Sequence, residues 1–173
     1  MKKLLVVVDM KNDFITGSLG SKDAESIVDI VCKKIKDFNG DIVYTLDTHD
    51  KDYLSTQEGK NLPVLHCVRN TIGWKLNEKI AKVLENKKNV LAFSKETFGS
   101  VDLGEFVLSK NYDKIEFCGL CTDICVISNA MIVKAFLPEA EITVDAKACA
   151  GVTKESHLNA LNAMKSCQIK IIN

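Results

Sequence analysis

Several features that define large classes of protein are scarce in this sequence. Only two prolines occur in 173 residues, and neither marks a linker between domains. No apolar run approaches the roughly 20 residues that a membrane-spanning helix needs. The 23 basic side chains are balanced by 23 acidic ones, so charge gives no case for binding nucleic acid or an acidic membrane surface. We therefore expect a single globular domain over residues 1–173. The sequence does not decide the oligomeric state, and a homo-oligomer is one possibility.

A secretory signal is also missing. The opening MKKLLVVVDMKNDF places two lysines before an apolar run, but the run ends at Val8 and no small-residue cleavage site follows. Seven cysteines, an odd number, in a chain without such a signal favour reduced thiols. We therefore expect a cytoplasmic protein in which most cysteines, such as Cys32 and Cys67, are small buried side chains.

The sequence does contain a regular alternation of apolar β-branched runs with helix patterns. Six strands are expected: Leu4–Met10, Asp41–Asp47, Asn89–Lys95, Lys114–Leu120, Glu141–Ala146 and Gln168–Ile172. Four helices are expected between them: Asp23–Phe38, Trp74–Leu84, Asp123–Phe136 and Thr153–Cys167. This alternation predicts an α/β fold, a three-layer sandwich with a six-stranded, mostly parallel sheet and helices on both faces.

The ends of the strands are the first places to look for a site. Ligands of open α/β sheets bind beyond the carboxyl ends of the strands, where Asp9, Asp47, Lys95 and the turn at 119–125 lie. Residues 48–73 show neither a strand nor a helix pattern, and so long a loop in a compact domain is usually functional. Asp9, at the rim of the sheet and partly desolvated, suits a general base. A capping role for Asp9 and a solvated Lys95 are the simpler alternatives, and Asp13 is the nearest competing carboxylate.

Three cysteines lie within eight residues in the stretch FCGLCTDICVISNAM. Cys118 falls inside a strand and is expected to be core. Cys121 precedes a helix that starts near Thr122, so a Cys121–Cys125 disulfide is not expected in a reducing compartment. Cys125 lies in the first helical turn, where free N–H groups stabilise a thiolate and can hold an oxyanion. A structural zinc site lacks its second Cys-x-x-Cys pair here, so Cys125 is the candidate nucleophile.

Only three histidines are present. His49 and His66 flank the irregular segment, Asp47 ends the strand before it, and Glu58 lies within it. Two histidines and carboxylates with open positions suit zinc, iron or manganese, although two loop histidines can also be plain surface residues. His157, in the last helix, is expected to pack or to form a hydrogen bond. If His49 and His66 bind a metal, Asp9 remains as the base for Cys125.

The motifs together resemble the isochorismatase-like cysteine hydrolases, and among them the nicotinamidase (pyrazinamidase) branch. The similarity covers nearly the whole chain, through VVVDMKNDFITGSLG, SKETFGS, GLCTDICV and VDAKACAGVTKESHLNAL in that order. It implies a catalytic triad of Asp9, Lys95 and Cys125. It also implies a cis bond between Leu120 and Cys121, with the backbone N–H groups of Cys121 and Cys125 as the oxyanion hole. One departure is Lys11, where glutamine is frequent.

The resemblance further implies one divalent metal ion, with zinc favoured over iron or manganese, on Asp47, His49 and His66. Glu58 is a candidate fourth ligand. Phe14, Phe98 and Leu120 would line the substrate pocket, with Tyr53 or Trp74 as additional walls.

The activity implied is hydrolysis of nicotinamide to nicotinate and ammonia through a cysteine thioester, with the metal orienting the pyridine ring. The alternative is a metal-free hydrolase of the same family that acts on another amide, a carbamoyl compound or an isochorismate-like vinyl ether. A non-catalytic, flavodoxin-like binding module is a third hypothesis. It predicts no reactive thiol, and the sequence lacks a glycine-rich phosphate loop after the first strand.

Overall fold

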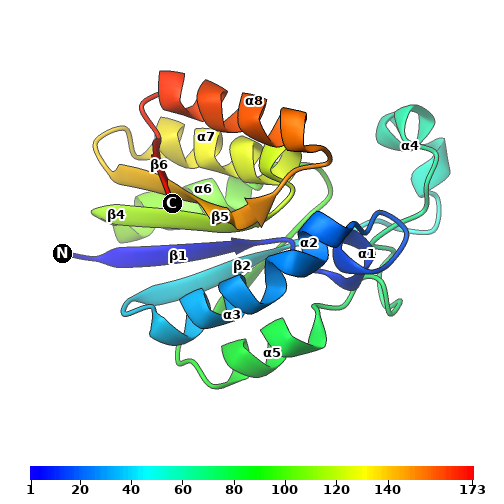
Figure 1. The fold of residues 1–173 in the computed structure, drawn as a ribbon, viewed down its shortest axis with the longest axis horizontal. Helices are drawn as coiled ribbons and strands as arrows, with labels where there is room; N and C mark the ends of the chain where they lie inside the picture. The colour runs from blue at the N-terminus through cyan, green and yellow to red at the C-terminus, as the bar shows by residue number, and fades with distance from the viewer.

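A computed structural model describes residues 1–173. Its centre is a six-stranded sheet in the order β3-β2-β1-β4-β5-β6 (Figure 1). Every neighbouring pair of strands is parallel, so the expected mostly parallel sheet is in fact wholly parallel. The strands are β1 Lys3–Val8, β2 Asp41–Asp47, β3 Leu91–Lys95, β4 Lys114–Leu120, β5 Glu141–Ala150 and β6 Lys170–Ile172.

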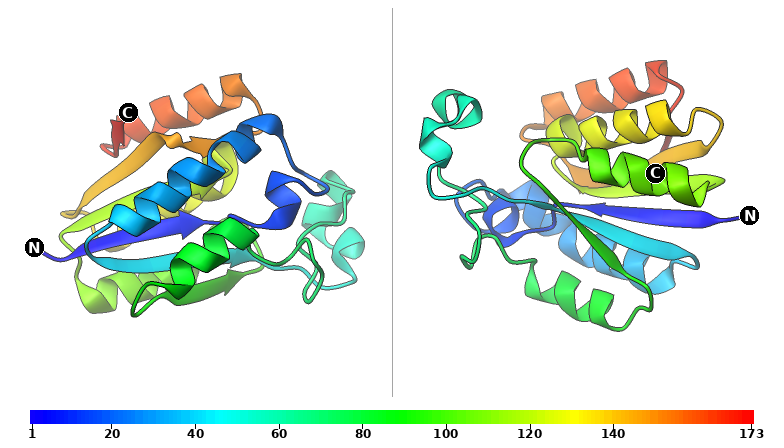
Figure 2. Two further views of the ribbon diagram at one scale, coloured as in Figure 1. Left: turned by 60° about the horizontal axis from the view of Figure 1, so that its bottom comes forward. Right: turned by 180° about the vertical axis from the view of Figure 1, so that it is seen from behind.

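Helices cover both faces of the sheet, as the alternating pattern predicts (Figures 1 and 2). On one face lie α2 (Lys22–Ser26), α3 (Val28–Asp37) and α5 (Glu78–Glu85); on the other lie α6 (Val101–Lys110), α7 (Ile127–Phe136) and α8 (Lys154–Ser166). Two buried apolar clusters, one on each face, use alternate residues of β1: Leu4, Val6 and Val8 in one, Leu5 and Val7 in the other. A strand buried on both faces must be apolar throughout, which explains the LLVVV run. None of these helices is both long and apolar enough to cross a membrane.

Four short elements complete the chain at the carboxyl edge of the sheet: α1 (Asn12–Ile15), the 3-10 turn η1 (Tyr53–Ser55), α4 (Gln57–Asn61) and the π-helical turn η2 (Thr122–Val126). Two of them, η1 and α4, lie within the segment 48–73 that was expected to have no helix. Both are single turns, too short to give a periodic pattern.

Helix α6 was not predicted. Its sequence VDLGEFVLSK contains a glycine and lacks a clean apolar stripe. The glycine is there because a Cβ at Gly104 would lie 2.6 Å from the ring of Phe136, so α6 and α7 pack closely at this point. Two signals mark the helix all the same: Ser100 caps its first turn, and Asn111 ends it in the left-handed conformation. The expected helix Asp23–Phe38 is likewise two helices, α2 and α3, which meet at Ile27.

The strand order places the candidate residues side by side. The chain runs outward from β1 to β2 and β3, then crosses to β4 on the other side of β1. The carboxyl ends of the four strands that carry candidates therefore meet at one edge, at the point where the strand order reverses. In the register of the sheet, Asp47 is directly opposite Lys95, and Val8 is opposite Gly119.

Candidate active site

Asp9 directly follows β1 and is completely buried. Its backbone is left-handed, with φ at 45°, a conformation that aspartate tolerates better than most residues. Oδ1 accepts hydrogen bonds from the hydroxyl of Thr45 (2.8 Å) and the backbone N–H of Asp47 (2.9 Å). Oδ2 lies 2.7 Å from Lys95 Nζ but has no aligned hydrogen-bond donor. One carboxylate oxygen is therefore fixed, while the other is available to a proton.

Lys95 ends β3 and points into the site rather than into solvent. Its Nζ donates to the Thr97 carbonyl (3.1 Å) and lies 3.2 Å from Asp47 Oδ1 and 3.5 Å from Cys125 Sγ. Burial opposes the charge of Lys95, but the negative charges of Asp9, Cys125 and Asp47 outweigh burial and hold its pKa above the ordinary value. Lys95 is therefore a permanently charged ammonium between Asp9 and Cys125.

Cys125 lies in η2, directly after the turn that leaves β4. The peptide bond between Leu120 and Cys121 is cis, as the resemblance implied. Gly119 has φ at 119°, and a Cβ there would lie 2.1 Å from the Val8 carbonyl oxygen. Only glycine lets the end of β4 approach β1 this closely, and this approach carries the turn to Asp9.

The electrostatic environment of Cys125 favours the neutral thiol. The free N–H groups of the first turn were expected to stabilise a thiolate here, with Asp9 as the base that takes the thiol proton. Burial raises the pKa of Cys125 well above its ordinary value, and the charge of Asp9 raises it further, whereas the charge of Lys95 lowers it. Desolvation therefore outweighs the few free N–H groups of one turn. A buried thiol beside a carboxylate is an arrangement in which a base is needed to form the thiolate.

The other cysteines are free thiols. Cys118 is buried in β4 as expected, and no Cys121–Cys125 disulfide is present. His157 forms a hydrogen bond with the Thr122 hydroxyl (2.7 Å), which leaves no histidine in contact with Cys125.

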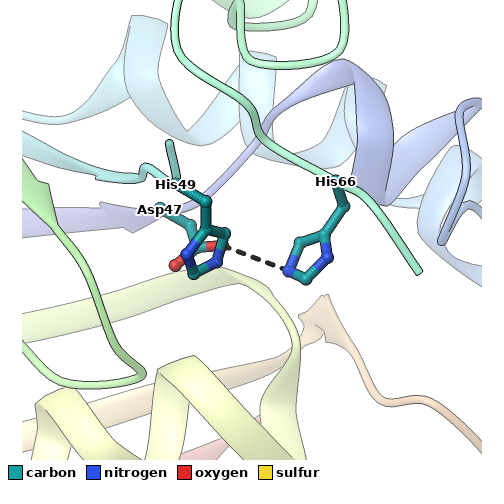
Figure 3. A group of neighbouring side chains, drawn as sticks. All are labelled: Asp47, His49 and His66. Atoms are coloured by element: carbon teal, nitrogen blue, oxygen red, sulfur yellow. Dashed lines mark ion pairs between the residues drawn. The ribbon is translucent and has the colours of Figure 1, made fainter. Parts of the chain in front are cut away.

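The second cluster of candidates lies next to the first. Donor atoms of Asp47, His49 and His66 all lie within 4.8 Å of one another, and all three residues are buried. Figure 3 shows the Asp47 carboxylate behind the His49 ring, with the His66 ring to one side and directed toward them. Asp47 Oδ2 is 3.0 Å from His49 Nε2 and 3.6 Å from His66 Nε2. Glu58 Oε1 approaches the same two nitrogens, at 3.7 and 3.9 Å.

This cluster has the chemistry of a metal site. His49 Nε2 is buried without a hydrogen-bond partner, as a nitrogen that offers its lone pair to an ion would be. His66 Nδ1 is 2.8 Å from the Val64 carbonyl, and donating to that oxygen leaves Nε2 free to ligate. Burial works against the charge of Asp47, but the close contact with His49 and the positive charge of Lys95 keep the pKa of Asp47 below its ordinary value. An ionised carboxylate and two available imidazole nitrogens fit a divalent ion.

The expected pocket residues occupy different places. Phe14 is buried, with its ring 5.7 Å from that of His66. Leu120 is fully buried at the end of β4, whereas Phe98 is exposed by 43%. Phe98 lines a cavity of about 420 Å³ together with His49, Tyr53 and Glu58.

Two aromatic side chains support the metal-binding cluster. Tyr53 is buried, with its ring 4.5 Å from that of His49 and 4.9 Å from that of His66. Trp74 donates to the Thr48 hydroxyl. Tyr53 therefore packs against the two candidate ligand histidines, and the Trp74 indole N–H binds Thr48, the residue between Asp47 and His49.

Three supporting residues were not identified from the sequence. Thr45 fixes one oxygen of Asp9, as described above. Lys11 is fully buried, donates to the Asp47 carbonyl and lies 5.1 Å from the centre of the Trp74 ring. Asp13, considered only as a competitor of Asp9, accepts a hydrogen bond from the Cys67 N–H (2.7 Å) and so anchors the residue after His66. A threonine, lysine or aspartate near a strand end is too common in sequences to be singled out. The supporting role of these three residues is visible only from the hydrogen bonds that they make to other segments in the folded structure.

Comparison with known proteins agrees with this geometry. The isochorismatase domain model matches residues 3–173. The isochorismatase family protein PncA of Bacillus subtilis is 30% identical over 94% of this chain and 93% of its own. The crystal structure of nicotinamidase/pyrazinamidase PncA from Bacillus subtilis superposes with a TM-score of 0.90 at 26% identity, covering 100% of both chains.

A third similar structure contains a metal. The pyrazinamidase of Pyrococcus horikoshii in complex with zinc has a TM-score of 0.85 at 27% identity, covering 100% of this chain and 99% of that one. The fold, the order of the motifs and these similarities lead to one conclusion: the chain belongs to the isochorismatase family and is a hydrolase.

Proposed function

We propose that this protein hydrolyses nicotinamide to nicotinate and ammonia through a thioester on Cys125. The observation that carries the proposal is the contact between two clusters. Lys95 touches Asp9 and Cys125 on one side and Asp47 on the other, and Asp47 also faces His49 and His66. A nucleophile with its base thus lies beside a set of metal ligands, in a chain whose relatives include nicotinamidases.

The first half-reaction forms the thioester. Asp9 Oδ2 takes the proton of the Cys125 thiol, and the resulting thiolate attacks the amide carbon. Lys95 stabilises the negative charge as it moves from Asp9 to sulfur. The amide oxygen becomes an oxyanion, for which the backbone N–H groups of Cys121 and Cys125 are the candidate donors. The protonated Asp9 then gives its proton to the leaving nitrogen, the C–N bond breaks and ammonia departs.

The second half-reaction consumes water. Asp9, again a carboxylate, takes a proton from a water molecule that attacks the thioester carbon. The C–S bond breaks, the acid product forms, and Asp9 returns the proton to the sulfur of Cys125. Asp9 therefore serves as base and then acid in each half-reaction, a role that Oδ2, which is paired with Lys95 but accepts no aligned hydrogen bond, permits.

The metal site would provide orientation. Asp47, His49 and His66, with Glu58 as a fourth candidate, would hold one divalent ion, and zinc is favoured by two imidazoles with carboxylates. When bound, the ion would supply a Lewis-acidic contact for the pyridine nitrogen, directly or through water. Phe14, Phe98 and Leu120 are the proposed pocket walls around the ring.

The deciding experiment measures ammonia release and metal content in the same purified sample. Nicotinamide is compared with other aromatic and aliphatic amides and a carbamoyl compound, and an isochorismate-like vinyl ether is followed by its own product. We expect nicotinamide to be preferred, with close to one divalent ion per chain. Turnover of another substrate by a metal-free sample would replace this proposal with a metal-free hydrolase of the same family.

A further inference from the structure

Asn129 occupies a position that neither the catalytic chemistry nor the metal site explains. It lies on α7, one helical turn after Cys125, and its side chain is completely buried. A buried amide is costly unless its donors and acceptor are satisfied, so the partners of Asn129 show what it holds.

Three backbone groups converge on this one amide. Nδ2 donates to the Cys125 carbonyl (2.8 Å) and to the Phe98 carbonyl (3.0 Å). Oδ1 accepts from the Ser100 N–H (3.0 Å). The side chain of Asn129 therefore ties the Phe98–Ser100 segment to the turn that carries Cys125.

The segment is shaped to fit against α7. A Cβ at Gly99 would lie 2.4 Å from Ile132 Cδ1, so the backbone of the segment lies against a side chain of α7. The residue before the segment is also held, because the ammonium of Lys95 donates to the Thr97 carbonyl. The segment's one exposed aromatic side chain, Phe98, faces the cavity that also contains His49.

We propose that Asn129 is a positioning residue that sets the aromatic wall of the substrate pocket, Phe98, at a fixed distance from Cys125. The inference rests on the proposed function, because it assigns Phe98 to the wall against which an aromatic amide packs. Asn129 acts through Phe98 and not on the reacting atoms, so its loss raises KM more than it lowers kcat.

Asn129→Ser is the sharpest variant. On the same helix, the Ser128 hydroxyl donates to the carbonyl four residues earlier, that of Ile124. A serine at 129 can therefore keep the bond to the Cys125 carbonyl, but it is too short to bridge to Phe98 and Ser100. We expect KM for nicotinamide to rise about tenfold with a smaller change in kcat, because a displaced Phe98 loses contacts with the aromatic ring that are made equally in the ground state and the transition state.

Two comparisons separate positioning from simple destabilisation. Val133→Ala removes buried apolar contacts from the same helix and none of the hydrogen bonds that Asn129 makes, and we expect it to lower Tm but leave KM within about twofold. In a double-mutant cycle, Asn129→Ser should add little to Phe98→Ala, because both act on the same wall. Asn129→Asp keeps the shape of the side chain but replaces the donating Nδ2 with an oxygen that cannot donate to the Phe98 carbonyl, so it should raise KM in the same Phe98-dependent way even if Asn129→Ser does not fold.

A turnover-independent measurement keeps this proposal apart from the proposed function. The rate at which N-benzyl iodoacetamide alkylates Cys125 is divided by the rate for iodoacetamide, with both followed by peptide mass spectrometry. This ratio depends on Phe98, because only the benzyl reagent carries an aromatic ring that can pack against it. We expect the ratio of rates to fall in Asn129→Ser and Phe98→Ala alike, and not in Val133→Ala. If wild type released no ammonia from nicotinamide, the proposed function would fail while this ratio still tested Asn129. The positioning role would be overturned if Asn129→Ser changed KM and the ratio of alkylation rates no more than Val133→Ala does. It would also be overturned if the effects of Asn129→Ser and Phe98→Ala on KM multiplied in the double variant.

Discussion

At the scale of single residues, the proposed chemistry depends on the different partners of the two carboxylate oxygens of Asp9. Asp9 uses one oxygen for Thr45 and the Asp47 N–H and keeps the other for Lys95 and the thiol. Because burial holds the pKa of Cys125 above its ordinary value, the thiol does not ionise unaided near neutral pH. In the proposed mechanism, the nucleophile therefore depends on proton transfer to Asp9.

Asp9→Asn should slow both turnover and alkylation of Cys125. The amide keeps the size of the side chain but cannot accept the proton, so turnover should fall by about a thousandfold or more. Iodoacetamide labelling of Cys125 in the variant should be slower than in wild type at neutral pH. In wild type, the labelling rate should keep rising with pH across the neutral range, because more of the thiol ionises as the pH approaches the raised pKa of Cys125. Peptide mass spectrometry distinguishes Cys125 from the exposed Cys167, which serves as the internal control. Equal labelling rates for Cys125 in both proteins would mean that Asp9 is not the base.

At the scale of elements, the segment 48–73 contributes three of the four candidate metal ligands, His49, Glu58 and His66. It leaves β2 at Asp47, forms η1 and α4, and returns so that His66 lies next to His49. The return is fixed by two contacts, the bridge between His49 and Val68 and the hydrogen bond from Cys67 to Asp13.

His49→Ala should impair nicotinamide turnover through binding while leaving the thiol chemistry in place. His49 does not contact Cys125, so iodoacetamide labelling of Cys125 should stay close to the wild-type rate. The metal content of the purified variant should fall. Loss of a residue that only orients a metal ligand typically costs about 10- to 100-fold in metal affinity or activity, so loss of a ligand should cost at least as much. Labelling that fell together with turnover would show that the two clusters are not separable.

The elements also show what could be predicted from sequence and what could not. Strand β1 is apolar from Leu4 to Val8 because both of its faces are buried, and β2 and β4 each contain a shorter apolar run, so the ends of these strands, and Asp9 and Asp47 with them, were predictable. Helix α6 was not, because Gly104 is required by the packing of Phe136 rather than by the helix itself. The buried roles of Lys11 and Asn129 were also out of reach, since a lysine or asparagine on its own is typical of a solvated surface.

At the scale of the whole molecule, the site joins the two halves of the sheet. Asp9 follows the central strand, Asp47 and Lys95 come from β2 and β3 on one side, and Cys125 follows β4 on the other. A ligand that binds the folded protein at this junction and not the unfolded chain should therefore stabilise the molecule as a whole.

Removal of the metal should lower the thermal stability of the protein. At a free ion concentration of about 1,000 times Kd, binding adds roughly 4 kcal/mol, which corresponds to a shift in Tm of about 8–16 °C for a domain of this size. Chelation should lower Tm in wild type, and re-addition of zinc should restore it. Asp47→Asn is the matched control, because a variant that has lost the carboxylate ligand should respond much less. A wild-type Tm that did not change on chelation of a metal-loaded sample would argue against a built metal site.

Ammonia release from nicotinamide by wild type and Cys125→Ala, measured side by side, tests the central claim most directly. Cys118→Ala and Cys121→Ala are the controls, because the first thiol is core and the proposed contribution of Cys121 is a backbone N–H. We expect wild type to release ammonia, both controls to keep most of that activity, and Cys125→Ala to lose it by about a millionfold while remaining folded. Release of ammonia by Cys125→Ala at the wild-type rate would contradict the account.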